Sequence, residues 1–242
     1  MFSDFKRSAG ILLHISSLPS EYGIGTLGKA ALRFADFLEA SGQRFWQLLP
    51  LGHTGYGDSP YQSFSAFAGN PYFIDPELLA DEGLVSRRSL ERLPRGDGRY
   101  VEYGELYRTR FSLLSEAAGT GWSAGGEELS SFLSENEFWL PDYSLFMALK
   151  RLFGGAEFTK WPDRGAALRS SDAPDRWRAR LRDDIRTYTF AQFLFFRQYR
   201  ALKRCCGEHG VYIIGDVPIY TAPDSADVWS HPENYLLDGE RR

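Results

Sequence analysis

The sequence predicts an α/β fold with parallel strands and a long, mostly helical insertion after the second strand. Three observations in the 242 residues support it. Two short apolar segments, residues 10–15 and 45–49, enclose one amphipathic helical segment with short joints. More than a hundred residues then pass without a strand pattern, until residues 211–214 form a third, β-branched segment. A chain of this length can bury one sizeable core.

The first three elements are predicted to form a βαβ unit. Residues 10–15 read as a buried strand, and the helix that follows is indicated by apolar residues on one face, at Leu27, Ala31, Phe34 and Leu38. Thr26 is the expected N-cap of this helix and Gly42 its terminator. Because residues 45–49 follow at once, we expect a parallel strand pair with a right-handed crossover.

The insertion is predicted to be a series of helices. Helical patterns occur over residues 76–85 and 89–93, from a break at 101–104 to residue 118, and over 129–135 and 142–153. Residues 119–126 are predicted to be a flexible surface loop, and residues 161–175 an irregular charged segment. The arginine-rich segment 169–186 is interpreted as a solvated helix face.

The strongest helix signal lies at residues 183–206. Its apolar stripe fits a period of 3.6 residues and is interrupted at Gln192, with Gly207 and Gly210 as the predicted end. The strand at 211–214 then leads into Asp216. From residue 218 onward the sequence is expected to end without a closing structural element.

Asp216 has two interpretations. A carboxylate just beyond the carboxyl end of a parallel strand is where α/β barrels hold their chemistry. The alternative is an aspartate that caps a turn or helix. Only three barrel-type strands can be counted, and a complete (β/α)₈ barrel needs more. Either the fold is not a closed barrel, or the chain is the front part of a longer protein.

Residues 45–76 combine a short strand, stopped by Pro50, with a long loop rich in aromatic and polar residues. Rings alternate there with glycines and hydrogen-bonding groups, at Tyr56, Asp58, Ser59, Tyr61, Gln62, Phe64, Phe67, Asn70 and Tyr72. This mixture suits a sugar, because the C–H faces of a pyranose stack on aromatic rings and its hydroxyls need polar partners. The alternative is a structured loop whose rings seal the end of a core.

Composition excludes several classes of function. The net charge is −4 with 28 basic and 32 acidic residues and no basic block, which argues against nucleic acid as a partner. No apolar run reaches the length of a membrane span or of a signal-peptide core. Cys205 and Cys206 are adjacent, so a mutual disulfide would be strained, and they lack metal-ligand spacing. These features predict a cytoplasmic protein.

Several motifs together resemble one known family. They are SAGILLH at 8–14, SLP at 17–19, YGIG at 22–25, GQRFWQLLPLG at 42–52, GYGDSPYQSFSAFAGNP at 55–71, DYSLFMALK at 142–150, FLFFRQ at 193–198, IGDVPI at 214–219 and DSADVW at 224–229. These runs span nearly the whole chain and resemble the 4-alpha-glucanotransferases (amylomaltases or disproportionating enzymes) of glycoside hydrolase family 77, in the alpha-amylase clan.

The resemblance implies a fold and a reaction. The fold would be the N-terminal portion of a (β/α)₈ TIM barrel, with the long helical insertion after its second strand. The reaction would move α-1,4-glucan segments between maltooligosaccharides by retaining double displacement, which uses a nucleophilic carboxylate and a second carboxyl group as acid and base. Neither a metal ion nor an organic cofactor is implied.

The resemblance also assigns roles to individual residues. Tyr61 matches a tyrosine that stacks on the sugar beside the scissile bond, and Asp216 matches a supporting carboxylate of the catalytic site. Asp58 and Ser59 would contact the glucan. Two tyrosines, Tyr56 and Tyr103, fall where the family has a second, remote glucan-binding surface, although each could be a plain surface aromatic.

Some positions depart from the family pattern. Ile15 and His53 replace common prolines, and Thr26 replaces a frequent aspartate. His53 is expected to be a tolerated surface change. The motif that carries the family's nucleophile, of the type arginine-X-aspartate-histidine, occurs nowhere in residues 1–242, and the acid/base glutamate lies still further on in the family.

The chain is therefore expected to be an N-terminal fragment that is inactive by itself. Its expected parts are a βαβ unit at 1–52, the aromatic loop and helical insertion at 53–180, and the last helix, third strand and following loop at 181–242. The alternative is a non-catalytic α-glucan-binding fragment or the remnant of a decayed gene.

Overall fold

The computed structural model describes residues 7–55, 57–96, 98–170 and 172–239. The chain divides into two compact units. The first unit comprises Met1–Leu51, Asn70–Arg110 and Leu194–Val217, and the second unit comprises Gly52–Gly69, Phe111–Phe193 and Pro218–Arg242. Two helices, α4 and α9, contribute residues to both units.

Helices outnumber strands along the described residues. In chain order the elements are β1 (Gly10–Leu12), a 3-10 helix (Ile15–Ser17), α1 (Lys29–Ala40), β2 (Phe45–Gln47), a 3-10 helix (Pro71–Phe73), α2 (Pro76–Asp81), α3 (Arg87–Glu91), α4 (Tyr103–Gly121), α5 (Gly126–Glu135), α6 (Leu140–Leu152), a 3-10 helix (Phe158–Lys160), α7 (Arg164–Leu168), α8 (Ala173–Arg180), α9 (Arg182–Glu208), β3 (Tyr212–Ile214), α10 (Ala226–Ser230) and a 3-10 helix (Pro232–Asn234).

A three-stranded parallel sheet forms the centre of the first unit. Its strand order is β1-β2-β3, and Ile11, Trp46 and Ile213 lie in register across it. The predicted βαβ unit and the predicted third strand are therefore confirmed. The prediction that residue 15 belongs to the first strand is wrong, because the chain turns at His14 into a 3-10 helix.

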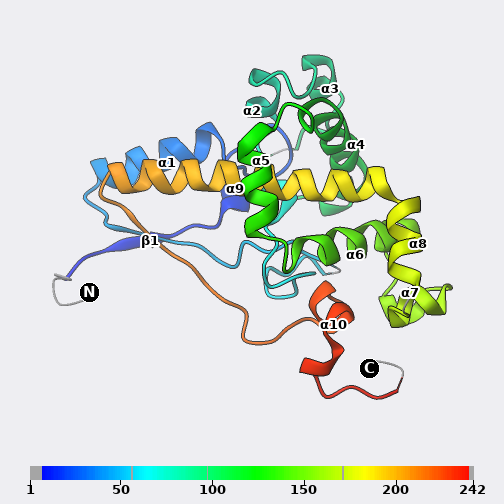
Figure 1. Cartoon of the computed structure of the whole chain (residues 1–242). Helices are drawn as coiled ribbons and strands as arrows, with labels where there is room; N and C mark the ends of the chain where they lie inside the picture. The colour runs from blue at the N-terminus through cyan, green and yellow to red at the C-terminus, as the bar shows by residue number, and fades with distance from the viewer. Residues whose placement is uncertain (1–6, 56, 97, 171, 240–242) are drawn as a thin grey trace. The chain divides into compact units, whose positions relative to one another are not determined.

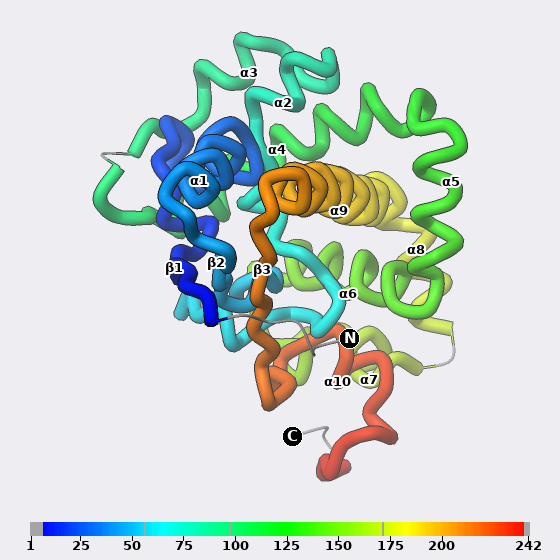
Figure 2. Tube along the Cα trace, turned by 90° about the vertical axis from the view of Figure 1, so that its left-hand side faces the viewer, coloured from blue at the N-terminus to red at the C-terminus, as the bar shows by residue number. Residues whose placement is uncertain are grey.

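Two helices cover one face of this sheet. Figures 1 and 2 show α1 and the C-terminal end of α9 side by side on the same side of the strands. Trp46 is fully buried, with its ring 4.8 Å from that of Phe34 on α1, and its Nε1 donates to the Leu13 carbonyl at 2.7 Å. Just after α9, His209 pairs with two carboxylates of α1, Asp36 and Glu39.

The opposite face of the sheet carries exposed apolar side chains. Side chains alternate between the two faces of a sheet along each strand. The residues next to Ile11, Trp46 and Ile213 therefore point away from the helices. Leu12 is 54% exposed, Tyr212 51% and Ile214 42%. The prediction that the first strand is buried is therefore wrong for Leu12, because the helices cover only the face of Ile11.

The caps of α1 differ from the predicted ones at one end. Gly28 is the N-cap residue, and the Thr26 hydroxyl instead donates to the Asp75 carboxylate at 2.5 Å. A Cβ on Gly28 would lie 1.9 Å from Asp75 Oδ2, so only glycine allows this approach. At the other end Gly42 has a φ of +69° and follows the helix as predicted.

The second unit is mainly helical, and two glycine-based predictions are inaccurate along α4, which has residues in both units. The predicted loop over residues 119–126 is shorter than expected: α4 continues to Gly121 and α5 starts at Gly126, which leaves residues 122–125 between the helices. Buried Leu113, Leu114, Ala117 and Ala118 pack this part of α4, and packing overrides the low helix propensity of glycine. Similarly, Gly104 lies inside α4.

The end of α9 also differs from the predicted end at Gly207. Gly207 lies inside this helix, which runs to Glu208, and Gly210 with a φ of +64° follows it.

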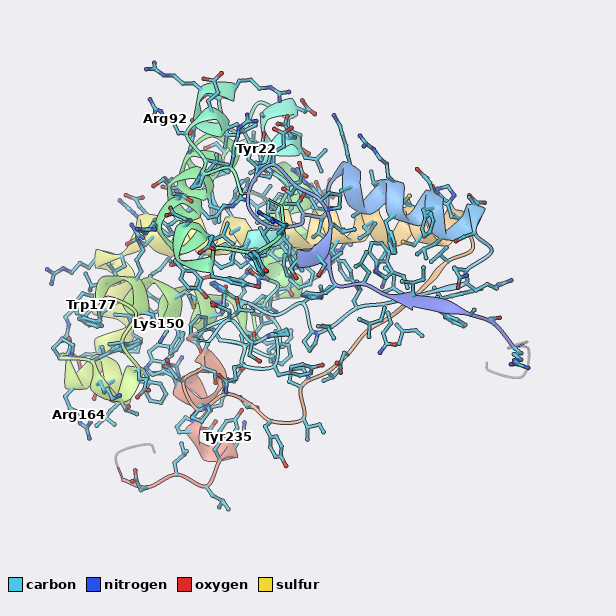
Figure 3. The ribbon with its side chains drawn as sticks, turned by 180° about the vertical axis from the view of Figure 1, so that it is seen from behind. Tyr22, Arg92, Lys150, Arg164, Trp177 and Tyr235 are labelled. Atoms are coloured by element: carbon cyan, nitrogen blue, oxygen red, sulfur yellow. The ribbon has the colours of Figure 1, made fainter. Side chains whose placement is uncertain are left out.

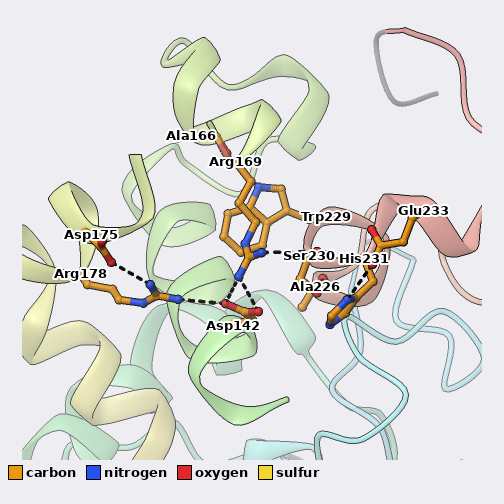
Figure 4. A network of polar contacts seen from close by, with 10 residues as sticks. All are labelled: Asp142, Ala166, Arg169, Asp175, Arg178, Ala226, Trp229, Ser230, His231 and Glu233. Atoms are coloured by element: carbon orange, nitrogen blue, oxygen red, sulfur yellow. Dashed lines mark hydrogen bonds and ion pairs between the residues drawn. The ribbon is translucent and has the colours of Figure 1, made fainter. Parts of the chain in front are cut away.

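A polar network holds α10 against other helices of the second unit. Arg169 Nη2 donates to both carboxylate oxygens of Asp142 at 2.6 Å, and Arg178 reaches the same carboxylate at 3.0 Å (Figure 4). The Arg169 guanidinium lies 5.5 Å from the ring centre of Trp229, whose Nε1 donates to the Ala166 carbonyl.

Three sequence-based interpretations fail at this network. Residues 161–175 are not irregular throughout, since they contain α7 and the start of α8, and Arg169 is not part of a solvated helix face. Its left-handed backbone, with a φ of 52°, places the residue after α7. Trp229 is 1% exposed within α10, so the sequence after residue 218 does include a packed helix.

Candidate functional site

The aromatic loop, Gly52–Gly69, is a closed hairpin. Gly52 pairs with Gly69 and Thr54 with Ser63 through antiparallel bridges. The Phe64 amide donates to the His53 carbonyl at 3.0 Å, and the Gly55 amide to the Gln62 carbonyl at 3.4 Å. These contacts form a ladder from the neck of the loop to its tip.

Three of the predicted glucan-contacting residues lie together at this tip. The Tyr61 side chain is 46% exposed, and the Tyr61 amide donates to the Ser59 hydroxyl at 3.3 Å. Asp58 has a left-handed φ of 57° and its amide donates to the Gly55 carbonyl at 3.1 Å. Aspartate tolerates this backbone conformation better than most residues. Tyr56 lies outside the described residues.

His53 is buried, which contradicts the predicted surface position. Its side chain is 3% exposed, and Nδ1 lies 2.8 Å from the hydroxyl of Tyr143 on α6. Burial, together with the positive charge of Lys150, lowers the pKa of His53 from its ordinary 6.5 to about 3. The imidazole is therefore neutral at physiological pH. The lone histidine in a loop sequence carried no signal of this, because its partner is 90 residues away.

A buried cation lies beneath the aromatic loop. Lys150 of α6, labelled in Figure 3, forms an ion pair with Asp224 and donates to the Ala156 carbonyl at 3.2 Å. Its Nζ also lies 4.9 Å from the ring centre of Phe64. The side chain is 6% exposed, so this contact is largely desolvated and stronger than its surface equivalent.

The segment around α10 also holds the loop. The Asp227 carboxylate accepts the Ala66 amide at 2.8 Å, and the Ala226 amide donates to the Phe64 carbonyl at 2.8 Å. Burial raises the pKa of Asp227, and the hydrogen bonds from the Ala66 amide and the Ser65 hydroxyl oppose that rise. The Asp227 carboxylate thus accepts hydrogen bonds from a backbone amide and a hydroxyl of the aromatic loop.

The other two predicted site residues belong to the first unit. Asp216 is half-buried and follows β3 by two residues, at the carboxyl end of a parallel strand. Tyr103 is the first residue of α4, also half-buried, with its ring 6.2 Å from that of Tyr107. The site residues are therefore divided between the units: Asp58, Ser59 and Tyr61 in the second, Asp216 and Tyr103 in the first.

Some functional possibilities find no support within the described residues. No group of three or more His, Cys, Asp or Glu side chains among them could hold a metal ion. Across those same parts of the chain, each helix is too short or too polar to cross a bilayer. Both cysteines are free thiols.

Comparison with known proteins identifies the family. The model of the glycoside hydrolase 77 family, described as 4-alpha-glucanotransferase, matches residues 13–241. A 4-alpha-glucanotransferase of Clostridium butyricum is 44% identical over 94% of this chain and 47% of its own length, and one of Thermus thermophilus is 47% identical over 99% and 48%.

Solved structures agree with this result. The amylomaltase from Streptococcus agalactiae in complex with acarbose superposes with a TM-score of 0.93, at 40% identity, over 98% of this chain and 48% of that one. The amylomaltase from Corynebacterium glutamicum, at 18% identity and a TM-score of 0.71, shares the fold. This chain spans about half the length of the relatives it matches, and it belongs to the 4-alpha-glucanotransferase family of glycoside hydrolases.

Proposed function

We propose that this chain serves the transfer of α-1,4-glucan segments between maltooligosaccharides, with the aromatic loop as part of the glucan-binding site. The observation that carries the proposal is Tyr61, half exposed at the tip of a hairpin whose base is buried and hydrogen-bonded. A phenol ring held in this way offers a face to the C–H groups of a glucose ring. The neighbouring Asp58 and Ser59 supply groups that can accept or donate to its hydroxyls.

The chemistry of the whole protein would be retaining double displacement. That mechanism needs two carboxyl groups about 5–5.5 Å apart, one to attack the anomeric carbon and one to protonate the leaving oxygen. We assign neither role to a residue of this chain. Asp216, at the carboxyl end of β3, is proposed as a supporting carboxylate. The three parallel strands and α9 are proposed as part of a (β/α)₈ barrel, with α2–α8 inserted after the second strand.

Two further assignments complete the proposal. Tyr103 and Tyr56 would belong to a second, remote glucan-binding surface. The two free thiols support a reducing, cytoplasmic setting.

Calorimetric titration of the full chain with maltoheptaose tests the proposal. We expect binding, with an affinity about tenfold lower in Tyr61→Ala and nearly unchanged in Tyr61→Phe, because the ring and not the hydroxyl makes the stacking contact. If the chain binds no maltoheptaose, or if Tyr61→Ala binds it as well as the unsubstituted chain, the aromatic loop is not a glucan site. Binding without transfer is the expected outcome, because the family's nucleophile motif occurs nowhere in this sequence.

A further inference from the structure

The side chain of Gln192 clamps the neck of the aromatic loop. Its Oε1 accepts the Gly69 amide at 2.8 Å, and its Nε2 donates to the Gly69 carbonyl at 2.9 Å. The backbone amide can only donate and the carbonyl can only accept, so the orientation of the glutamine amide is fixed. Gln192 is fully buried on α9, at the one polar interruption of that helix's apolar stripe.

Tyr143 extends this clamp to His53. The second hydrogen on Gln192 Nε2 points to the Tyr143 hydroxyl oxygen at 3.2 Å. The Tyr143 hydroxyl can then donate its proton to His53 Nδ1 at 2.8 Å, in the tautomer that carries the imidazole proton on Nε2. The tyrosine is 1% exposed, so the three side chains form one buried hydrogen-bonded chain.

His53 connects the buried hydrogen-bonded chain to the residues near the tip of the loop. Its carbonyl accepts the Phe64 amide at 3.0 Å and the Ser63 hydroxyl at 3.2 Å. The Phe64 ring stands edge-on to the imidazole at 5.3 Å, and a Cβ on Gly55 would meet that ring at 2.8 Å. The loop is therefore packed tightly between its buried base and the tip that carries Tyr61.

The hydrogen bonds of Gln192 are not required to join α6 to α9. A buried glutamine costs desolvation that an apolar residue at the same place would avoid. The same two helices are also joined by Thr189 Oγ1, which donates to Ser144 Oγ at 2.9 Å without a hydrogen bond to the loop. Joining the helices and holding the loop are thus separate tasks of separate side chains.

We propose that Gln192, Tyr143 and His53 are positioning residues for glucan binding: they hold the aromatic loop in the conformation that presents the Tyr61 ring to an α-1,4-glucan. The proposal rests on the proposed function, because it concerns the same loop. None of the three side chains touches the glucan; each acts through Tyr61.

Hydrogen exchange on the free full chain tests the clamp without any ligand. The readout is the exchange of the Phe64 and Gly55 amides, which the substituted side chains do not bond directly. In Tyr143→Phe and Gln192→Leu we expect these amides to exchange about tenfold faster, together with a shift of the Tyr61 ring resonances. The matched control Thr189→Val removes a buried hydrogen bond between the same helices and should leave both readouts unchanged.

A pair of His53 variants adds a control to the hydrogen-exchange experiment. His53→Asn keeps an acceptor near the position of Nδ1 and should restore slow exchange, whereas His53→Leu should not. The clamp is refuted if Tyr143→Phe behaves like Thr189→Val, or if all variants loosen the loop equally.

Maltoheptaose titration then tests whether the three residues affect glucan binding through Tyr61. Tyr143→Phe should weaken binding about tenfold, and the double variant Tyr143→Phe/Tyr61→Ala should bind no more weakly than Tyr61→Ala alone. Additive losses would show that Tyr143 does not act through Tyr61 and would overturn the proposal. If the unsubstituted chain binds no maltoheptaose while the exchange results hold, the proposed function fails and the clamp stands as a loop-positioning device.

Discussion

Two buried histidines give the chain a specific response to acid. Burial lowers the pKa of His14, in the first unit, to about 4, and that of His53, in the second, to about 3, from an ordinary 6.5. At a pH between these lowered values and 6.5, the unfolded chain binds protons on the two histidines that the folded chain does not bind. The stability that the two histidines contribute is therefore fully present above pH 6.5 and is lost as the pH falls toward 3.

His53→Asn tests this response at the residue scale. Removing one histidine with a lowered pKa should reduce the slope of the free energy of unfolding against pH, between pH 6 and pH 4, by about 1.4 kcal/mol per pH unit. The contribution of His14 remains. Chemical denaturation at several pH values measures the slope. An unchanged slope would mean that His53 is protonated at its ordinary pKa in the folded chain.

The ion pair between Lys150 and Asp224 supports a second prediction. Lys150→Met leaves the Asp224 carboxylate, 26% exposed, with the Phe158 amide as a hydrogen-bond donor and removes the cation beside Phe64. We expect a loss of roughly 3 kcal/mol in the free energy of unfolding. The double variant Lys150→Met/Asp224→Asn should recover part of this loss; a double variant as unstable as Lys150→Met would rule out an unpaired charge as the cause.

At the scale of the elements, two glycines with equal space around them should respond oppositely to alanine. No atom lies within 4 Å of a Cβ built on Gly42 or on Gly119. Gly119 lies inside α4, so Gly119→Ala should stabilise the chain by about 1 kcal/mol. Gly42 has a φ of +69°, so Gly42→Ala should destabilise it by about 1 kcal/mol. Thermal unfolding distinguishes the two signs, and a stabilising Gly42→Ala would contradict the left-handed backbone.

Periodicity predicted the elements that bury one continuous apolar face. The spacing of Leu27, Ala31 and Leu38 was sufficient for α1, and the apolar stripe at residues 183–206 was sufficient for α9. Glycine misled the prediction at residues 119–126, because packing of α4 is a tertiary effect. The prediction for His53 failed for the same reason, since its burial depends on a helix distant in sequence.

The candidate site was predictable only in part. The aromatic and polar composition of the loop indicated a sugar site, and Asp216 was found at the end of a strand. The partners that hold the loop, Gln192 and Asp227, are more than a hundred residues from it in sequence. The interruption of the apolar stripe at Gln192 was a visible signal, but it gave no indication of the partner.

At the scale of the whole molecule, the chain should not catalyse glucan transfer by itself. The proposed mechanism needs a nucleophile and an acid/base pair, and the family's nucleophile motif occurs nowhere in its sequence. The exposed side chains of Leu12, Tyr212 and Ile214 also predict marginal stability for the sheet. Incubation with maltotriose followed by chromatography should show no longer products. Elongation at a rate near that of a full-length relative would refute this expectation.

The burial of Trp46 provides an optical probe for one part of the chain. It is the single tryptophan of the first unit, whereas the second unit holds the other five, Trp122, Trp139, Trp161, Trp177 and Trp229. The fluorescence difference between the unsubstituted chain and Trp46→Phe therefore reports the solvent exposure of the first unit alone. Followed through a denaturant titration, it separates the melting of the sheet from that of the helical unit: coincident midpoints mean one cooperative transition, and distinct midpoints mean two.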